Sequence, residues 1–350
     1  MDLQFYRGKT VLVTGHTGFK GSWMCKVLKM QGANVIGYAL PAPTVPSLFE
    51  LSDMAKGMIS VEGDIRDLKR LNEVFDIYQP EIVIHMAAQP IVRESYANPV
   101  YTYETNVIGT VNVLEAVRLH ECVKSFVNVT TDKVYKNLEW EWGYRENDVL
   151  DGYDPYSNSK SCSELVTSSY RKSFFMGRDV AISTCRAGNV IGGGDFAKDR
   201  IIPDCIRAQE AGQKIIVRNP HSTRPYQHVL EPVCAYLKLA ELQYLDRETY
   251  EGSYNVGPDD CDCVTTGELV ELFCKCWGDH AYWKDVSEPG APHEAGFLKL
   301  DCSKIKRVMN WKPRWHVEEA VSYAAVFGRI YLAKGNLSEE MEREITEYLR

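Results

Sequence analysis

Two short polar motifs hold the side chains best suited to moving protons. The first, Thr130-Thr131-Asp132-Lys133, ends an apolar run, and the second is Tyr156-Ser157-Asn158-Ser159-Lys160. A Tyr and a Lys four residues apart lie on one face of a helix, one turn from each other. Because a nearby ammonium favours the ionised phenol, Lys160 is expected to lower the pKa of Tyr156 from about 10. A phenol tuned in this way can take a proton from an alcohol.

Asp132 and Lys133 supply an acid and an amine beyond what alcohol oxidation requires. Their position beside the apolar run indicates oxidation coupled to a second reaction that also moves protons. The alternative is a structural Asp–Lys ion pair at the end of a strand, and the sequence leaves that alternative open.

A glycine-rich turn near the N-terminus predicts a dinucleotide cofactor. Its glycines follow the apolar run 10–13 and open a helical pattern at 22–31. Such a turn lets the backbone approach a pyrophosphate, with the helix N-terminus facing it, although a plain tight turn is the alternative. His16 and Lys20 could contact or crowd the phosphates. The predicted cofactor-binding residues of this loop are Gly15, His16, Gly18, Phe19, Lys20 and Gly21.

The ribose site of this cofactor departs from the usual pattern. An acid is expected about 20 residues beyond the turn, at the end of the second strand. Here that segment reads Gly37-Tyr38-Ala39-Leu40, with neither an acid nor an Arg that would bind a 2′-phosphate. NAD is therefore favoured, through an altered ribose site.

Further cofactor contacts are expected where later strands end and in a nearby helix. Each has a structural alternative: a strand-end carboxylate for Asp64, close helix packing for the Ala pair, and a backbone-bonded amide for Asn106. His85 lies in an apolar strand and is interpreted as a core histidine. The predicted contacts are Asp64, Ile65, Ala87, Ala88, Gln89 and Asn106, together with Tyr156 and Lys160.

The elements that must position these residues alternate between strand and helix. Helical periodicity is clear at 68–78, with Leu71, Val74, Phe75 and Tyr78 on one face. Long helices are expected at about 100–120 and 156–175. Continuously apolar strands between helices predict a Rossmann-type α/β fold, with a doubly wound parallel sheet covered on both faces. The expected strands are 10–13, 34–38, 58–61, 81–86, 126–129 and 180–184.

The alternation of strands and helices stops after Arg186. This change predicts a smaller C-terminal lobe interleaved with the sheet domain. We expect a cofactor domain at 1–185 plus about 225–258, and a substrate-binding lobe at about 186–224 plus 259–350. His293 and Glu294 could line the lobe, but no motif assigns them a role.

Composition limits the possible partners and location. The net charge of −8 and the lack of a basic stripe argue against a nucleic-acid surface. No apolar run approaches the roughly 20 residues needed to span a bilayer. Eleven Cys, an odd number, indicate free thiols in a reducing cytoplasm, and Cys261-x-Cys263 and Cys274-x-Cys276 lack the usual zinc spacing. We therefore predict no metal, no membrane and a cytoplasmic location.

Together these motifs resemble the extended short-chain dehydrogenases/reductases, specifically the nucleotide-sugar 4,6-dehydratases. The resemblance covers roughly residues 8 to 335. Thr131-Asp132-Lys133 is similar to the CDP-glucose subfamily, whereas TDP-glucose enzymes carry Glu at the position of Lys133. Other matching segments are 15–21, 43–49, 85–88, 105–110, 142–147, 186–190, 224–228, 300–304 and 310–313.

The resemblance implies a nucleotide-sugar substrate, with CDP-glucose favoured, and a complete reaction. Tyr156 takes the 4-OH proton as C4 is oxidised, water is lost between C5 and C6, and hydride returns to C6 to give a 4-keto-6-deoxy sugar for deoxysugar and polysaccharide biosynthesis. Asp132 is the expected acid for the 6-OH, Lys133 the base for C5, and Thr131 a hydrogen-bond partner of the 4-oxygen or a strand-end cap. Lys160 is expected at the nicotinamide ribose.

The resemblance also implies substrate-binding residues and an assembly. Asn189, Arg224 and His228 are the expected substrate-binding residues, with a surface salt bridge as the alternative for Arg224. The helices near 100–120 and 156–175 match the family's dimer interface, so a homodimer or homotetramer is expected. Alternative functions are another dehydratase or a 4-epimerase of the same family, or a non-catalytic dinucleotide-sensing protein.

Overall fold

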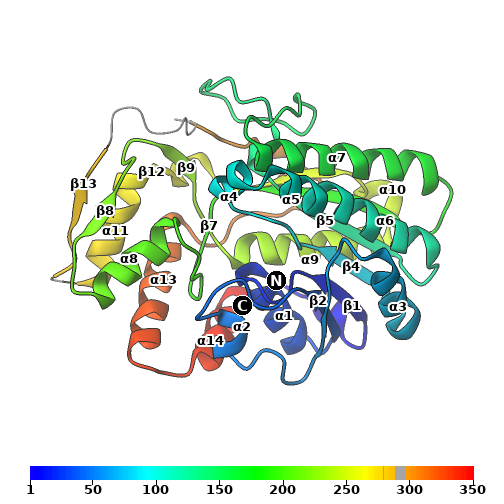
Figure 1. Cartoon of the computed structure of the whole chain (residues 1–350), viewed down its shortest axis with the longest axis horizontal. Coiled ribbons are helices and arrows are strands. Elements are labelled where there is room, and N and C mark those ends of the chain that lie inside the picture. The colour runs from blue at the N-terminus through cyan, green and yellow to red at the C-terminus, as the bar shows by residue number, and fades with distance from the viewer. Residues whose placement is uncertain (279, 288–296) are drawn as a thin grey trace.

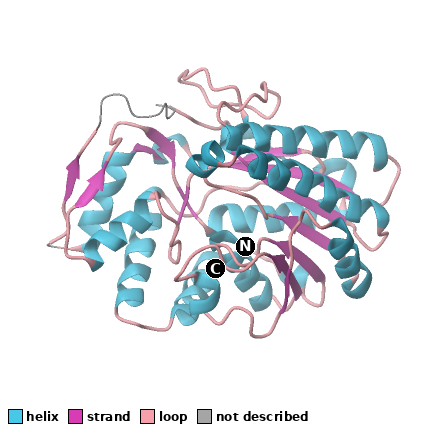
Figure 2. Ribbon diagram, in the orientation of Figure 1, coloured by secondary structure: helices cyan, strands magenta, loops and turns pink. Residues whose placement is uncertain are grey.

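A seven-stranded parallel sheet forms the centre of the computed structural model, which describes residues 1–278, 280–287 and 297–350 (Figures 1 and 2). His293 and Glu294 lie outside the described residues. The strand order is β11-β6-β5-β4-β1-β2-β3, so the direction of winding reverses between β1 and β4. This confirms the predicted doubly wound sheet and places a ligand crevice at the carboxyl ends of β1 and β4. The strands are β1 (Thr10–Thr14), β2 (Asn34–Ala39), β3 (Ile59–Glu62), β4 (Ile82–His85), β5 (Ser125–Thr131), β6 (Ala181–Ala187) and β11 (Ser253–Val256).

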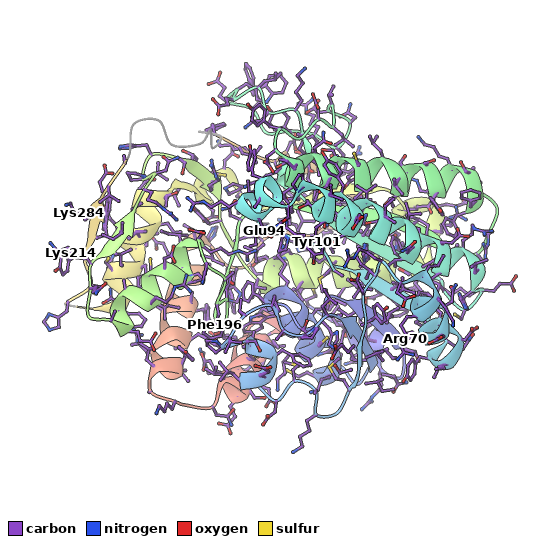
Figure 3. The ribbon with its side chains drawn as sticks, viewed as in Figure 1. Arg70, Glu94, Tyr101, Phe196, Lys214 and Lys284 are labelled. Atoms are coloured by element: carbon purple, nitrogen blue, oxygen red, sulfur yellow. The ribbon has the colours of Figure 1, made fainter. Side chains whose placement is uncertain are left out.

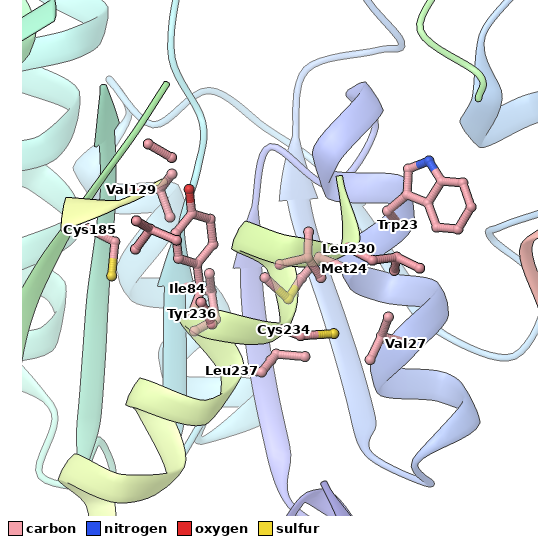
Figure 4. Packing of buried hydrophobic residues seen from close by; sticks show 14 of the residues in the cluster. Trp23, Met24, Val27, Ile84, Val129, Cys185, Leu230, Cys234, Tyr236 and Leu237 are labelled. Carbon is pink, nitrogen blue, oxygen red and sulfur yellow. The ribbon is translucent and has the colours of Figure 1, made fainter. Parts of the chain in front are cut away.

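Successive strand residues pack into different cores because side chains alternate between the two faces of a sheet. Val11 and Val13 belong to one buried cluster and Leu12 to the other. The first cluster packs under α1 (Phe19–Met30) and α9 (Leu230–Leu245), and Figure 4 shows Tyr236 and Leu237 of α9 within it. Helices α3 (Leu68–Tyr78), α6 (Gly109–Leu119) and α7 (Pro155–Phe174) cover the other face.

The expected helix at about 100–120 is interrupted. It consists of α5 (Pro99–Tyr103), a π-helical turn (Glu104–Ile108) and α6. Single π-helical turns inside helices occur frequently at functional sites. Here the turn carries Asn106, one of the predicted cofactor residues.

A third buried cluster forms the lobe, which lies on the left in Figure 1. Lys214 and Lys284 lie on its outer side, whereas Phe196 lies nearer the centre of the molecule and contacts the Tyr331 ring (Figure 3). The lobe elements are β7 (Val190–Ile191), α8 (Ile201–Glu210), β8 (Ile215–Val217), β9 (Thr223–Pro225), β10 (Gln227–His228), β12 (Cys263–Thr265), α11 (Thr266–Trp277), β13 (Trp283–Asp285) and α13 (Val317–Leu332).

The C-terminal helix α14 (Leu337–Leu349) departs from the expected domain division. Met341 and Ile345 belong to the same buried cluster as Trp23 and Val27 of α1, so α14 packs on the sheet domain as well as on α13 of the lobe. The remaining helices are α2 (Leu48–Leu51), α4 (Val92–Ala97), α10 (Arg247–Tyr250) and α12 (Ser303–Met309), with short 3-10 turns at Gln4–Tyr6, Asp132–Val134 and Asp260–Asp262. Among the described residues, no helix has the length and apolar character needed to cross a membrane.

Candidate active site

The glycine turn after β1 is too tight for any side chain at two of its positions. A Cβ at Gly15, where φ is +78°, would lie 2.8 Å from the Ala87 nitrogen. A Cβ at Gly21 would lie 2.1 Å from the Gly15 carbonyl oxygen, whereas one at Gly18 would meet nothing closer than 3.5 Å. The turn therefore packs closely on the start of α1, the geometry in which a helix N-terminus can face the pyrophosphate of a dinucleotide.

The altered ribose site is filled by an imidazole. His16 is buried against Gly37, where a Cβ would lie 2.3 Å from its ring, and its Nε2 lies 2.7 Å from Ser60 Oγ. Burial lowers the pKa of His16 to about 4, so the ring is neutral. The His16 ring thus packs beside β2, and the expectation that this residue contacts or crowds the phosphates stays a prediction. The sequence signal for this packing is Gly37, because its lack of a side chain leaves space for the His16 ring.

Contacts between β2 and the end of β3 hold the segment that was predicted to meet the adenine. The Tyr38 hydroxyl donates to the Asp64 carbonyl oxygen at 2.8 Å, and the Asp64 carboxylate pairs with Arg66 at 2.7 Å. Ile65 packs against Gly109 at the start of α6. Asp64 and Ile65 thus lie where the sequence placed them, at the carboxyl end of β3.

Asn106 connects the loop after β4 to the helix that carries Tyr156. Its Oδ1 accepts from the Gln89 N–H at 2.8 Å, and its Nδ2 donates to the Gln89 carbonyl at 3.0 Å and to Ser159 Oγ at 2.9 Å. This arrangement holds Ala87, Ala88 and Gln89 over the glycine turn. His85 is buried, its Nδ1 lies 2.8 Å from Thr14 Oγ1, and burial lowers its pKa to about 3, as befits a core histidine.

Two features fix Tyr156 in the first turn of α7. Asp154 caps the helix by accepting from the Ser157 N–H at 3.0 Å, and Pro155 occupies the first turn. Further along α7, the buried Glu164 accepts from Thr184 Oγ1 at 2.7 Å and from Arg186 Nη2 at 2.9 Å. A buried ion pair with such hydrogen bonds holds α7 in one register against β6.

Thr131, Asp132 and Tyr156 meet at the carboxyl end of β5. Thr131 Oγ1 donates to Asp132 Oδ1 at 3.0 Å, and the Thr131 hydroxyl is close enough to the Tyr156 phenol to oppose the effect of burial by lowering the pKa of that phenol. Asp132 is 1% exposed, and burial raises the pKa of its carboxyl despite the opposing charge of Lys133. The buried carboxyl is thus favoured in the form that can donate a proton.

Lys133 is the next residue after Asp132, but its ammonium forms no ion pair with the Asp132 carboxylate. Among the described residues, its Nζ makes neither a hydrogen bond nor an ion pair, so the alternative of a structural Asp–Lys pair is not what the structure holds. A half-buried amine that is not tied to a carboxylate remains available to a substrate.

Lys160 and Tyr156 do not interact as the sequence predicted. Lys160 Nζ donates to the Val129 carbonyl oxygen at 3.1 Å, and burial lowers the pKa of Lys160 to about 8. Burial raises the pKa of Tyr156 to about 12, while the contact with Thr131 and the charge of Arg200 lower it. In this structure Arg200 is a cation that favours the Tyr156 phenolate, and the expected effect of Lys160 on that phenol stays a prediction.

Arg200 and Asp195 are site residues that the sequence interpretation missed. Arg200 Nη1 lies 2.9 Å from Asp195 Oδ2, and Asp195 is almost fully buried. The charges of Arg200 and Lys160 act on Lys20, whose pKa burial lowers to about 8. Both missed residues lie in the irregular segment after the Gly192-Gly193-Gly194 run, where no motif singles them out. Only the concentration of charge in an otherwise apolar region could have indicated them.

Arg224 approaches Asp132 from the lobe. It lies in β9, which pairs with β12, is only 4% exposed, and its charge lowers the pKa of Asp132. Its burial places the guanidinium in the interior near Asp132, and its role in substrate binding stays a prediction. Asn189 is half-buried at the end of β6, and its carbonyl accepts from the Gln227 N–H at 3.0 Å.

The His228 side chain does not join Thr131, Asp132 and Tyr156. Its ring is fully buried among Trp23, Trp315 and Tyr323, and its Nε2 lies 3.3 Å from Glu344 Oε2. The expectation that His228 binds substrate is corrected, because a side chain enclosed between α1 and α14 presents no atom to the crevice.

A cysteine-containing cluster in the lobe has a structural explanation. Ligand atoms of Cys261, Asp262 and His316 lie within 4.8 Å of one another. However, Asp262 Oδ1 accepts from the Val317 N–H at 2.9 Å and Oδ2 lies 3.0 Å from His316 Nδ1, so both carboxylate oxygens serve the start of α13.

Comparisons with known proteins agree with this geometry. The family model described as GDP-mannose 4,6 dehydratase matches residues 12–323. A CDP-glucose 4,6-dehydratase from Salmonella typhimurium is 48% identical over 354 residues, covering 100% of this chain and 98% of its own. The crystal structure of a dTDP-glucose 4,6-dehydratase from Bacillus anthracis in complex with NAD has a TM-score of 0.77 at 22% identity, covering 94% and 99% of the two chains. A UDP-glucose-4-epimerase from Stenotrophomonas maltophila with bound NAD gives 0.80 at 22% identity over 92% and 98%.

Proposed function

The chain belongs to the GDP-mannose 4,6 dehydratase family, and from that premise we propose that it is a CDP-glucose 4,6-dehydratase. It is an NAD-dependent hydro-lyase that converts CDP-D-glucose to CDP-4-keto-6-deoxy-D-glucose. The observation that carries this proposal is the contact of Thr131, Asp132 and Tyr156 at the end of β5, with Lys133 beside them. A 4-epimerase would need the Tyr but neither the acid nor the amine, so it is the less suited alternative.

The residues of the crevice fit the cofactor. We assign the glycine turn to the pyrophosphate, His16 and the end of β3 to the adenosine side, and Lys160 to the nicotinamide end, and their contacts support this assignment. Bound NAD⁺ would supply a reversible hydride acceptor for C4 and C6, with no net change of the cofactor. The protein therefore has to supply only proton transfers and orientation.

Each proton transfer has a residue in place for it. Tyr156 takes the 4-OH proton, with Thr131 beside the 4-oxygen. The resulting 4-ketone acidifies the C5 proton, which Lys133 removes and later returns. Asp132 donates to the departing 6-OH, in line with the raised pKa of its buried carboxyl.

The lobe is proposed to hold the nucleotide. Arg224 is buried within reach of the Asp132 charge, and Asn189 lies at the junction between sheet and lobe. A guanidinium binds phosphate oxygens in a bidentate manner, so Arg224 is assigned to the substrate pyrophosphate, with Asn189 beside it.

A homodimer, or a dimer of dimers, is proposed through α5 and α7. Large apolar side chains are exposed there: Val100 is 69% exposed, Tyr103 36% and Leu165 55%. Apolar side chains gathered on neighbouring helices favour association. Light scattering should give two or four chains per particle, and a monomer would refute the proposal. A cytoplasmic location stays a prediction.

The experiment that tests the function supplies CDP-glucose, TDP-glucose, UDP-glucose and GDP-mannose separately with NAD⁺. Mass spectrometry should detect loss of one water from CDP-glucose. Absence of a dehydrated product with all four substrates would refute a dehydratase, whereas reaction with TDP-glucose alone would refute only the choice of nucleotide.

A further inference from the structure

The Asp132 carboxyl lies against the backbone that follows β6. The last paired residues of β5 and β6 are Thr131 and Ala187. The residues after them, Asp132 and Gly188, are therefore neighbours. A Cβ on Gly188 would stand 2.9 Å from Asp132 Oδ2 and 2.8 Å from Pro225 Cγ, so the missing side chain is what leaves room for the carboxyl. The φ of Gly188 is negative, so the backbone conformation does not itself require glycine here.

The two oxygens of this carboxyl have different surroundings. Oδ1 accepts from Thr131 Oγ1 at 3.0 Å, whereas Oδ2 is buried and has no hydrogen-bond partner among the described residues. A protonated carboxyl donates from one oxygen and keeps the other as an acceptor. Since Oδ1 is already an acceptor, Oδ2 is the oxygen suited to hold the acid proton and to meet the leaving 6-OH. The place of Oδ2 therefore decides whether Asp132 can act as an acid.

The backbone around Gly188 is more firmly held than the carboxyl that it contacts. Arg186 Nη2 donates to the buried Glu164 carboxylate at 2.9 Å, which fixes the end of β6 on α7. The Gln227 N–H donates to the Asn189 carbonyl oxygen at 3.0 Å, which ties β10 of the lobe to the segment after β6. The carboxyl, by contrast, accepts a single hydrogen bond within the described part of the chain. An added methyl group would therefore move the carboxyl rather than the backbone.

We propose that Gly188 is a positioning residue for the acid in the loss of water, because its missing side chain lets Asp132 Oδ2 lie against the end of β6. This inference rests on the proposed function and adds a residue to it. The Cβ of Gly188→Ala would stand about 0.5 Å inside ordinary contact with Oδ2, which begins at 3.4 Å. Displacing a reacting group by about 1 Å can cost about 100-fold in rate. The three atoms nearest to that Cβ belong to Asp132 and Pro225 and none to Tyr156, so oxidation at C4 should be spared.

The first test compares Gly188→Ala with Gly257→Ala. Gly257 follows β11 as Gly188 follows β6, but a Cβ there meets nothing closer than Cys302 Sγ at 3.3 Å. Single turnovers with CDP-glucose and NAD⁺ are followed by absorbance of the reduced cofactor and by the mass of the sugar. In Gly188→Ala, elimination should slow by about 10- to 100-fold more than oxidation, so that reduced cofactor and the 4-keto sugar accumulate. Gly257→Ala should keep the wild-type ratio of the two rates.

The proposal is wrong if oxidation and elimination slow by the same factor in Gly188→Ala, or if neither slows. Accumulation of reduced cofactor in both variants would also overturn it, because Gly257 does not contact Asp132.

A second test needs neither substrate nor cofactor. Thermal unfolding is measured for Gly188→Ala in the wild-type chain and again in an Asp132→Ala background, from which the carboxyl is absent. The substitution should lower the unfolding midpoint less in the second background, because only the contact with Pro225 remains. An equal shift in both backgrounds would mean that the methyl group does not press on the carboxyl, and the proposal would fall.

Two further outcomes are decisive. If Gly188→Ala alone does not fold, the proposal requires that it folds when combined with Asp132→Ala, and an unfolded double variant overturns it. If the wild type neither reduces NAD⁺ nor dehydrates any of the nucleotide sugars, the proposed function is refuted, while the unfolding comparison still decides whether Gly188 makes room for the Asp132 carboxyl.

Discussion

Lys160 Nζ donates to the Val129 carbonyl oxygen at 3.1 Å, across the junction between α7 and β5. The ammonium is thus buried and held by a neutral acceptor. Such an environment disfavours the charged form, which explains why the pKa of Lys160 falls to about 8 from its ordinary 10.5. The cofactor-free protein accordingly carries a destabilising charge at neutral pH.

Lys160→Met should raise the stability of the cofactor-free protein while abolishing catalysis. Because the folded pKa lies below the unfolded one, the native state carries the full cost of burial below about pH 8 and is relieved of it between about 8 and 10.5. The variant should gain roughly 1 to 3 kcal/mol at pH 7 in urea unfolding. Its stability should also rise less between those two pH values than that of the wild type.

The control for this prediction is Lys172→Met, an exposed position on the same helix. Its stability should stay within about 0.5 kcal/mol of the wild type. A loss of stability in Lys160→Met would show that the contact with Val129 outweighs the cost of burial.

Two alanine substitutions in the glycine turn should separate folding from cofactor binding. Gly21→Ala places a Cβ 2.1 Å from the Gly15 carbonyl oxygen, so it should destabilise the fold by roughly 2 kcal/mol or more. Gly18→Ala meets nothing closer than 3.5 Å and should leave unfolding unchanged while weakening NAD binding, because its methyl group projects at the predicted phosphate site. Thermal unfolding and NAD titration measure the two effects, and equal stability of both variants would contradict the prediction.

Asp132→Asn combined with Lys133→Ala should uncouple the two halves of the reaction. Tyr156 still removes the 4-OH proton, but the acid and the C5 base are gone, so reduced cofactor should accumulate without loss of water. Removing general acid–base groups costs about 10² to 10⁴ in rate. The control is Lys172→Met, at an exposed position of α7, which should react like the wild type. Unchanged dehydration in the double variant would show that Asp132 and Lys133 are structural.

The sequence predicted the parallel sheet well because the strand pattern is local. Continuously apolar strands between helices predicted the parallel sheet. The spacing of Tyr156 and Lys160 predicted that the two residues share one face of a helix. What failed depends on contacts between distant segments. The Asp195–Arg200 pair joins the site from an irregular segment, and Lys160 turns to the Val129 carbonyl because β5 passes beneath α7.

His228 illustrates the same limit. It shares a short segment with Arg224, and both were expected to bind the substrate. The segment instead forms two separate short strands, β9 and β10, and the second runs beside β7 toward α14. Only the packing of the C-terminal helix, far away in sequence, determines that His228 meets Glu344.

The contact between His228 and Glu344 leads to a last prediction, on how the stability of the protein depends on pH. Glu344 is fully buried, and burial raises the pKa of its carboxyl well above the ordinary 4.5. His228, whose pKa burial lowers to about 3, is neutral above that pH and offers no charge to offset a carboxylate. The other charged groups acting on Glu344 are Glu340, Glu347 and Arg343, and burial outweighs the Arg.

Glu344→Gln should therefore stabilise the protein at neutral pH but not in acid. At about pH 4 the carboxyl is protonated in both states and the substitution is nearly neutral. As the pH rises above 4.5, the unfolded chain loses this proton more readily than the folded one, so wild-type stability falls while the variant is unaffected. At pH 7 the variant should be roughly 1 to 3 kcal/mol more stable in urea unfolding. Glu347→Gln, a half-exposed position on the same helix, should change stability by no more than about 0.5 kcal/mol at either pH. A Glu344→Gln variant that is less stable at pH 7 would mean that the carboxylate is ionised and held by the Nε2–H of His228, and that α14 docks through an ion-dipole contact rather than through a buried acid.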